Sequence, residues 1–295
     1  MQNGLISRLG LGTVQFGQIY GVANQRGKIP KQEAFEILKH AQITGLKTLD
    51  TSVAYGNSEN IIGELTSEGQ FSFEVISKIL VGSDRLSKDH MDRALHDSLH
   101  RLRNSQLYGC LIHRFDDFLK HDHLWEILEG FKKNGFVKKI GFSLYHPHEL
   151  ELILDRGISP DIIQVPLSVF DRRFEKSFKM LKEGRTEIHV RSVFLQGLVF
   201  LTPDRLKGNL CKAKTQLEKL QKLSAAKGIS INALCLNYVL LNPFIHKVIM
   251  GCDSLEHFKK NIEDLEFFEK VSCLKSELED LTIEDEDVLL PYKWN

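Results

Sequence analysis

Residues 107–143 read LYGCLIHRFDDFLKHDHLWEILEGFKKNGFVKKIGFS, and this stretch carries the prediction of the fold. An apolar run at 107–113 is followed by an amphipathic segment at 123–134 and then by a second apolar run at 137–143. Short apolar runs predict buried strands, and the longer amphipathic segment between them predicts a helix. We expect the two strands to pair in parallel, because a parallel connection needs a long crossover.

The same alternation extends in both directions along the chain. The predicted strands are 9–13, 46–50, 73–79, 107–113, 137–143, 161–165, 187–194 and 247–251. The predicted helical segments are 31–43, 57–66, 88–102, 123–134, 147–155, 169–183, 210–227 with 231–241, and 255–268. Eight such units predict an α/β protein, a single-domain (β/α)₈ TIM barrel over residues 1–295, rather than an open doubly wound sheet. An acidic extension starts at about residue 270, and within it 277–287 is expected to form a terminal helix and a solvated end.

Charge and composition exclude several classes of function. The 39 basic and 39 acidic residues cancel, so no basic excess indicates a nucleic-acid partner and no polybasic run indicates a membrane surface. Residues 1–8 lack the pattern of a signal peptide, and no apolar run approaches the ~20 residues that span a bilayer. We therefore expect a cytoplasmic protein, either a monomer or a homo-oligomer. Five scattered cysteines without a Cys-x-x-Cys pair predict free thiols and no metal site.

Four reactive side chains occur where predicted strands end. Asp50 ends the second apolar run, and Tyr55 follows in the next loop. Lys78 lies at the end of the third run, and His113 ends the fourth. The active site of a barrel enzyme lies at the carboxyl ends of its strands. We therefore expect these four side chains to converge on one pocket, although they are far apart in the sequence.

The chemistry of this set fits proton transfer to a carbonyl oxygen. The ordinary pKa of tyrosine, ~10, is too high for easy proton transfer at neutral pH, and a nearby ammonium lowers it by stabilising the phenolate. Asp50 would hold Lys78 charged and in place, and a neutral His113 would polarise or orient the carbonyl. Taken singly, such residues are more often caps, solvated amines or packing groups, so the hypothesis depends on their joint placement.

The sequence around this set resembles the aldo-keto reductase superfamily from about Arg8 to Asn261. Residues 9–13, LGLGT, resemble the opening strand of the family, and residues 49–59, LDTSVAYGNSE, are similar to its first signature. The resemblance implies an NAD(P)H-dependent oxidoreductase that interconverts an aldehyde or ketone and its alcohol by hydride transfer. It also implies that the catalytic tetrad consists of Asp50, Tyr55, Lys78 and His113. Tyr55 would be the general acid/base, Lys78 paired with Asp50 would ease the proton transfer, and His113 would orient the substrate.

The resemblance further implies a nicotinamide cofactor at the ends of the later strands. Ser143 and Gln164 resemble the clamp for the carboxamide, although Leu144 stands where the family often has Asn. Residues 191–198 resemble the loop along the pyrophosphate, and residues 248–261 resemble the adenosine end. The cofactor-binding residues implied in this way are Gly12, Thr13, Asp50, Ser143, Gln164, Arg191, Ser192, Phe194, Gln196, Gly197, Gly251, Asp253, His257 and Asn261.

Two features of the implied cofactor site leave alternatives open. Arg191 stands where many relatives place an aromatic ring that stacks on the nicotinamide, and a guanidinium can either stack or reach the substrate. The resemblance favours NADP(H). However, Gly251 and His257 occupy the places of the Lys or Arg that grip its 2′-phosphate, and Asp253 adds a negative charge, so NAD(H) is also possible.

The predicted partner is a small carbonyl compound. Six polar residues expected near the mouth suit a hydroxylated substrate such as a sugar: Gln15, Gln18, Arg114, Asp116, Tyr145 and Arg172. The loop 15–28 is expected either to fold over the mouth or to form a plain surface hairpin. Two other classes remain: a lyase or isomerase barrel with Lys78 as a Schiff-base amine, and a catalytically weak nicotinamide-binding regulatory or sensor barrel.

Overall fold

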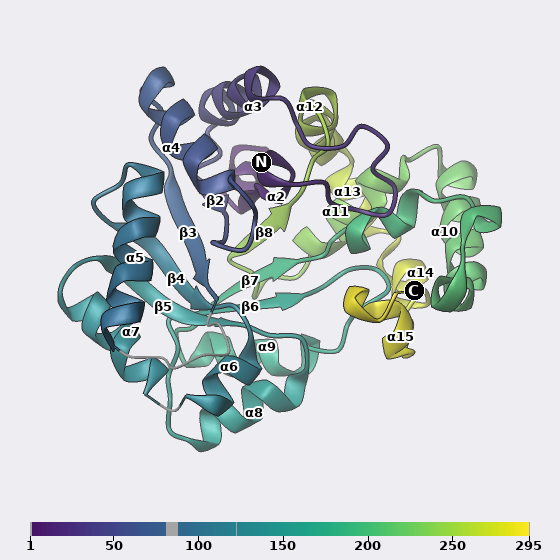
Figure 1. Ribbon diagram of the computed structural model, residues 1–295. Coiled ribbons are helices and arrows are strands. Elements are labelled where there is room, and N and C mark those ends of the chain that lie inside the picture. Colours follow the sequence, from purple (N-terminus) through teal and green to yellow (C-terminus); the bar gives the residue numbers. More distant parts are fainter. Residues whose placement is uncertain (1, 81–87, 122, 295) are drawn as a thin grey trace.

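In the computed structural model, which describes residues 2–80, 88–121 and 123–294, eight parallel strands form a closed barrel in the order β1 to β8 (Figure 1). The strands are β1 (Leu9–Gly12), β2 (Thr48–Asp50), β3 (Glu74–Ile79), β4 (Leu107–Ile112), β5 (Val137–Ser143), β6 (Ile162–Pro166), β7 (Glu187–Arg191) and β8 (Lys247–Met250). The predicted (β/α)₈ TIM barrel is confirmed, because β1 pairs with both β2 and β8 and so closes the sheet.

Helices alternate with these strands and cover the outside of the barrel. The longer helices are α3 (Lys31–Thr44), α4 (Ser58–Gly69), α5 (Lys88–Leu102), α7 (Leu124–Lys133), α8 (Pro147–Asp155), α9 (Glu175–Glu183), α10 (Lys214–Lys227), α11 (Ile231–Leu240) and α12 (Leu255–Glu263). In α3 the buried residues Ala34, Ile37, Leu38 and Ala41 follow helical spacing, so one face packs on the sheet. Gly45, with φ of 83°, ends this helix in a left-handed cap.

Shorter helices connect these elements or extend the termini. They are α1 (Gln2–Ile6), α2 (Val14–Gly17), α6 (Phe115–Lys120), α13 (Phe268–Ser272), α14 (Lys275–Glu279) and α15 (Glu286–Leu289). The 3₁₀ turns are η1 (Leu195–Phe200), η2 (Pro203–Arg205), η3 (Gly208–Ala213), η4 (Asp264–Phe267) and η5 (Pro291–Lys293). The predicted helix 255–268 is therefore divided among α12, η4 and the start of α13.

Two predicted elements are shorter in the structure. The helix predicted at 169–183 begins only at Glu175, because the Ser168 side chain accepts hydrogen bonds from the backbone N–H groups of Phe170 and Asp171 and holds a turn there. The strand predicted at 187–194 ends at Arg191, because Ser192 has a φ of 63° and cannot continue a strand.

The barrel interior has an apolar floor and a polar upper layer. Ile76, Leu111 and Ile162 form a buried cluster of their own, apart from the main core between strands and helices. Lys78 and Gln164 lie two residues further along the same strands as Ile76 and Ile162, so they point to the same interior side. The barrel thus presents buried polar groups at the carboxyl ends of its strands.

The C-terminal segment is not one solvated helix. It contains α14, α15 and η5, and it buries Leu278, Val288 and Leu290. The backbone N–H of Ile283 donates to the carbonyl of Phe170 over 2.9 Å, which fixes the segment to the loop after β6. In Figure 1 this yellow segment lies beside the ends of β6 and β7. The acidic extension therefore forms one wall at the carboxyl end of the barrel.

Within the described residues, no single helix combines the length and the apolar composition needed to cross a membrane. By those two criteria alone, the pair formed by Gly208–Lys227 and Ile231–Leu240, bent by 99°, passes.

Candidate active site

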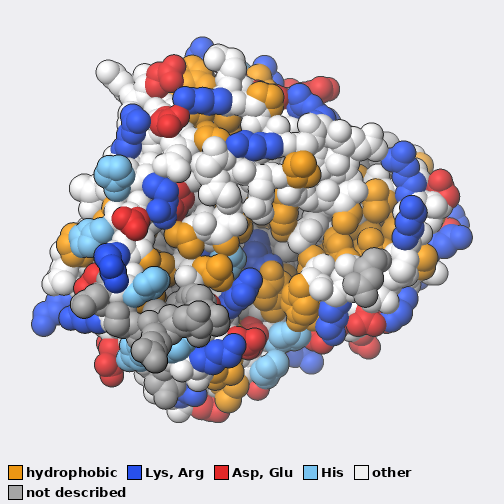
Figure 2. Space-filling model, viewed as in Figure 1, with side chains coloured by type: hydrophobic (Ala, Val, Ile, Leu, Met, Phe, Trp, Pro, Cys, Tyr) orange, Lys and Arg blue, Asp and Glu red, His pale blue; other side chains and the backbone are white. Residues whose placement is uncertain are grey.

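A cavity of about 540 Å³ opens at the carboxyl ends of the strands. Figure 2 shows a hollow at the centre of this face, with Lys or Arg side chains in it and hydrophobic side chains beside it. The cavity brings together nearly all of the residues predicted for the site. Those that line it are Gly12, Thr13, Asp50, Tyr55, Lys78, His113, Ser143, Arg191, Ser192, Phe194, Gln196, Gly197, Gly251, Asp253, His257 and Asn261.

Asp50 and Lys78 form a buried ion pair at the base of this cavity. Lys78 Nζ donates to Asp50 Oδ1 over 2.5 Å and to the carbonyl oxygen of Thr51 over 3.1 Å. Burial lowers the pKa of Lys78, and the charge and hydrogen bond of Asp50 oppose that shift. Parallel pairing of β2 with β3 aligns Asp50 with Ile76, two residues before Lys78, so the two side chains meet on the same interior face.

Tyr55 is held above this ion pair by a tight turn after β2. Its backbone N–H donates to the carbonyl of Ser52 over 3.0 Å, and its carbonyl accepts from the N–H of Ser58 over 3.1 Å. Lys78 Nζ lies 5.2 Å from the centroid of the Tyr55 ring. Side chains from the ends of β2 and β3 and from the loop between β2 and α4 therefore share one space.

The protonation of Tyr55 differs from the expectation. We predicted that Lys78 lowers the pKa of the phenol, but burial raises this pKa well above its ordinary value, and the negative charge of Asp50 raises it further. The Lys78 charge is already engaged by Asp50. Tyr55 is therefore protonated at neutral pH and can act as a proton donor.

His113 completes the group as a neutral ring. Its Nδ1 lies 3.0 Å from Ser52 Oγ, and its ring meets that of Tyr55 edge-on with centroids 5.9 Å apart. Burial and the neighbouring charge of Lys78 lower the pKa of His113 to about 3. The ring is thus uncharged at neutral pH, and with Nδ1 engaged by Ser52 it has Nε2 left for the cavity that it lines.

Gln164 is the one predicted site residue that does not line the cavity. It is completely buried, and its Nε2 donates to Asp50 Oδ2 over 2.7 Å. Its Oε1 has no hydrogen-bond partner among the residues that the structure describes. The side chain of Leu144 is buried as well, so Ser143 is the member of the predicted carboxamide clamp that faces the cavity.

The loop after β7 has a strained backbone where it borders the cavity. Ser192, Leu195 and Gln196 all have positive φ angles, of 63°, 43° and 52°, although none is glycine. The backbone N–H of Val22 donates to the Gln196 carbonyl over 2.9 Å, and Tyr20 and Asn24 line the cavity. Of the two alternatives for the loop 15–28, the structure shows the one that folds over the mouth. Strain of this kind is found where a loop is shaped for binding.

The cavity is also lined by cationic side chains outside the predicted set. Arg205 and Lys260 line it together with His257. Lys260 Nζ pairs with Asp264 Oδ1 over 2.7 Å, so its charge is engaged elsewhere. Arg205 follows the predicted pyrophosphate loop by several residues, and no local motif signals its position. Only the path of η1 and η2 brings Arg205 to the cavity.

The six polar residues expected near the mouth divide into two groups. Gln15 and Tyr145 line the cavity, whereas Gln18, Arg114, Asp116 and Arg172 do not. Gln15 Nε2 is 3.4 Å from Asp253 Oδ1. Among the described residues, no group of three or more His, Cys, Asp or Glu side chains is placed to hold a metal ion.

Comparison with known proteins gives a consistent result. Residues 8–275 match the family model described as the aldo/keto reductase family. The chain is 26% identical over 285 residues to the uncharacterized oxidoreductase YqkF of Bacillus subtilis, which covers 88% of this chain and 87% of that protein. It is 27% identical over 167 residues to the methylglyoxal reductase DkgA of Yersinia pestis, covering 55% of this chain and 54% of that one.

Solved structures share the fold. The holo form of aldo-keto reductase AKR11C1 from Bacillus halodurans has a TM-score of 0.73 at 20% sequence identity and covers 94% of this chain and 93% of that one. Its apo form has a TM-score of 0.69 and covers 94% and 92%.

Proposed function

Because this chain belongs to the aldo/keto reductase family, whose members are NAD(P)H-dependent oxidoreductases, we propose that it interconverts an aldehyde or ketone and its alcohol at the cavity described above, with Tyr55 as the general acid/base. The observation that carries the proposal is the convergence of Asp50, Tyr55, Lys78 and His113 at one end of that cavity. Each comes from a different strand end or loop, and together they supply one proton donor, one ion pair and one neutral ring.

The four residues have distinct roles in this proposal. Tyr55 is protonated at neutral pH, so it can donate its proton as negative charge develops on the carbonyl oxygen. The neutral His113 can present Nε2–H to the same oxygen when Ser52 donates to Nδ1. The ion pair with Asp50 fixes Lys78 Nζ 5.2 Å from the centroid of the Tyr55 ring, where its ammonium would interact with the phenolate that remains after proton transfer.

The cavity also has the groups that a nicotinamide dinucleotide needs. When bound, this cofactor supplies or accepts the hydride. Ser143 would hold the carboxamide, the backbone of Ser192–Gly197 would follow the pyrophosphate, and Arg205 with His257 would meet the adenosine end. Gln15 also lines the cavity, and its buried Oε1 has no hydrogen-bond partner among the described residues.

We propose NADP(H) as the preferred cofactor. Gly251 and His257 provide no cation of the kind expected to bind a 2′-phosphate, but the guanidinium of Arg205, which lines the same cavity, could supply one. The carboxylate of Asp253 is directed toward Gln15 Nε2, and its backbone carbonyl accepts from Arg26 over 3.0 Å. Asp253 is thus part of the cavity wall, and its charge does not remove the site for a phosphate.

The proposal is tested with Tyr55→Phe. We expect the purified variant to bind the nicotinamide cofactor as the wild type does but to turn over carbonyl substrates at least ~100-fold more slowly, because the general acid is lost. Fluorescence titration measures binding, and the change in absorbance of the reduced cofactor measures turnover. Wild-type rates in the variant would remove Tyr55 from the mechanism.

Cofactor titration, turnover and borohydride trapping separate the alternatives. A regulatory or sensor barrel would bind the cofactor tightly, and the wild type would reduce none of a panel of aldehydes and sugars. A Schiff-base enzyme would be trapped on Lys78 by borohydride in the presence of substrate. The hydrogen bonds of Lys78 Nζ to Asp50 and to the Thr51 carbonyl argue against that second alternative, because they engage the amine in an ion pair.

A further inference from the structure

Arg191 places a positive charge in the cavity without an acidic partner. It ends β7, and its Nη2 donates to the carbonyl oxygen of Leu144 over 2.9 Å while Nη1 lies 3.3 Å from Ser192 Oγ. Its guanidinium lies 4.2 Å from the centroid of the Tyr145 ring. No carboxylate within residues 2–80, 88–121 and 123–294 forms an ion pair with it, so its contacts fix its position without neutralising its charge.

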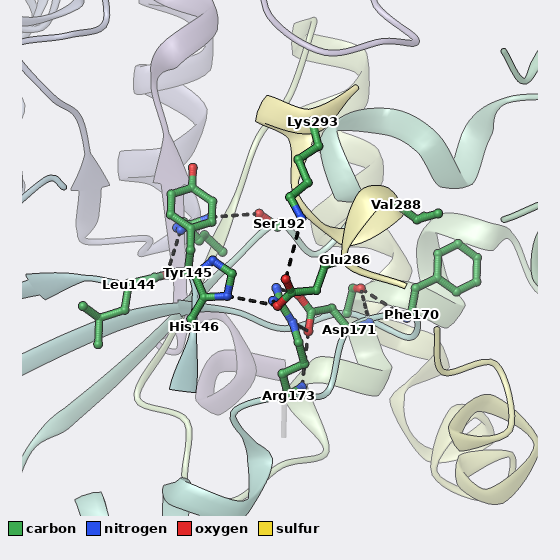
Figure 3. A network of polar contacts seen from close by, with 12 residues as sticks. Leu144, Tyr145, His146, Phe170, Asp171, Arg173, Ser192, Glu286, Val288 and Lys293 are labelled. Carbon is green, nitrogen blue, oxygen red and sulfur yellow. Dashed lines mark hydrogen bonds and ion pairs between the residues drawn. The ribbon is translucent and has the colours of Figure 1, made fainter. Parts of the chain in front are cut away.

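Two other arginines close to this face are neutralised. Arg172 pairs with Glu175 over 2.6 Å, and Arg173 pairs with Asp171 over 2.9 Å. Figure 3 shows the acidic Glu286 turned toward His146 and Arg173, while Leu144, Tyr145 and Ser192 lie on the other side of the network. Glu286 is therefore already paired with these residues and not with Arg191.

The charge of Arg191 acts at the catalytic end of the cavity. Burial raises the pKa of Tyr55, and Arg191 opposes that rise. Burial lowers the pKa of His113, and Lys78 and Arg191 lower it further. Arg191 is thus placed to act on Tyr55 and His113, where the reacting carbonyl would lie.

The catalytic end consequently has a net positive charge. Asp50 and Lys78 neutralise each other, and His113 is uncharged. A guanidinium has five N–H donors in a planar fork, and the contacts above use two of them. The unused donors match the paired oxygens of a carboxylate or a phosphate, which a fork of this kind binds through two parallel hydrogen bonds.

We propose that the substrate is an anionic carbonyl compound whose carboxylate or phosphate binds Arg191 while its carbonyl carbon lies at Tyr55 and His113. The inference rests on the proposed function, because it assigns the substrate class of the same site. The anionic group takes no part in the bond changes. Its contribution is to orient the carbonyl and to supply the negative charge that the protein does not provide.

Matched pairs of substrates test this inference. Succinic semialdehyde is compared with butanal, and glyceraldehyde 3-phosphate with glyceraldehyde, so that each pair differs by one anionic group and the two pairs distinguish carboxylate from phosphate. In the wild type we expect kcat/KM to be about 10- to 100-fold higher for the anionic member of at least one pair, the size expected for a charge-assisted hydrogen bond. Arg191→Gln should abolish this preference, chiefly through KM, and Arg191→Lys should retain part of it.

Arg172→Gln is the matched control, because it removes an arginine that is close to this face but is paired with Glu175 and does not line the cavity, so the anionic preference should stay in place. Equal kcat/KM for both members of both pairs in the wild type would overturn the inference. So would equal losses for the anionic and neutral members in Arg191→Gln, since that result would mean that Arg191 serves the cofactor.

A binding measurement keeps this test independent of turnover. Calorimetry on the cofactor-loaded protein compares 4-hydroxybutyrate with 1-butanol, and glycerol 3-phosphate with glycerol. Tighter binding of an anion that depends on Arg191, together with no turnover of any pair, would remove the proposed function and retain the anion site. Turnover of the neutral substrates without any preference for anions in binding would remove the anion site and retain the proposed function.

Discussion

At the residue scale, burial and pairing together determine the charge of each side chain in the candidate site. Tyr55 and His113 are half-buried and uncharged at neutral pH, which leaves one as a proton donor and the other as a neutral ring. Lys78 is more deeply buried but keeps a carboxylate partner in Asp50. The carboxylate is in turn held by the amide of Gln164, so Asp50 and Lys78 form a fixed pair at the base of the cavity.

The lowered pKa of His113 predicts a dependence of stability on pH. This pKa is about 3 in the folded protein, against ~6.5 for an unperturbed histidine. Between these values the unfolded chain binds a proton that the folded protein does not, so the free energy of unfolding falls as the pH drops from ~6.5 toward 3, by at most about 1.4 kcal/mol per pH unit. Urea unfolding at several pH values should show a shallower slope for His113→Gln. The exposed His148→Gln is the control, and an unchanged slope in His113→Gln would contradict the prediction.

Arg205 is the residue that tests the predicted preference for NADP(H). If its guanidinium meets the 2′-phosphate, Arg205→Ala should raise the dissociation constant for NADPH by about tenfold, the effect of one charge-assisted hydrogen bond, and should change that for NADH little. Fluorescence titration with both cofactors measures this. Lys179→Ala, which removes an exposed charge on α9, controls for a general loss of positive charge. An equal change in the dissociation constants of NADPH and NADH would show that Arg205 does not bind the 2′-phosphate.

At the element scale, glycine backbones allow α2 to lie directly against the loop that holds Tyr55. A Cβ on Gly17 would collide with the carbonyl of Tyr55 and lie 2.8 Å from the backbone nitrogen of Ser58. Gly56, with φ of 56°, faces Gly17 from the other side. The position of Tyr55 therefore depends on a close contact between two main chains, which leaves no room for a side chain at Gly17.

Gly17→Ala is expected to disturb both stability and catalysis. The added methyl must displace the Tyr55 turn, so we expect a loss of about 1–3 kcal/mol in the free energy of unfolding, as for other overpacked sites, and a fall in kcat. Gly130→Ala in α7 is the control, since a Cβ there meets nothing within 4 Å and alanine favours a helix by about 0.5–1 kcal/mol. Denaturant unfolding and steady-state kinetics measure the two effects. Wild-type values for both in Gly17→Ala would contradict the proposed contact.

The elements that the sequence predicted well are those with a clear local period. Helix α5 and helix α8 coincide with the predicted segments 88–102 and 147–155. Helix α4 continues through Gly63, and glycine fits there because a Cβ would collide with the Arg101 carbonyl of α5. The errors have nonlocal or side-chain causes. Ser168 forms a turn where apolar spacing predicted a helix, and the position of Arg205 depends on the path of two 3₁₀ turns.

At the scale of the whole molecule, the C-terminal segment joins three loops at the mouth of the barrel. Glu286 contacts His146 after β5 over 3.0 Å and Arg173 after β6 over 3.1 Å. Lys212, in η3 after β7, pairs with Asp287 over 2.8 Å. Tyr292 packs edge-on against Tyr145, with ring centroids 5.5 Å apart. The acidic composition of 277–287 predicted solvation, because the partners that join the segment to these loops, His146, Arg173 and Lys212, are far away in the sequence.

Leu289→Ala tests whether this segment is part of the cooperative fold and of the substrate site. Leu289 is 1% exposed, so truncation should lower the free energy of unfolding by about 2–5 kcal/mol, as for other buried leucines. Loosening the segment should also release Tyr145, the ring on which Arg191 rests, and so raise KM for the carbonyl substrate more than the dissociation constant of the cofactor. Leu119→Ala, at a side chain that is 43% exposed, is the control for loss of leucine volume. Full stability with normal KM would show that the segment lies on the barrel without supporting it, whereas a loss of stability with normal KM would confine its role to the fold.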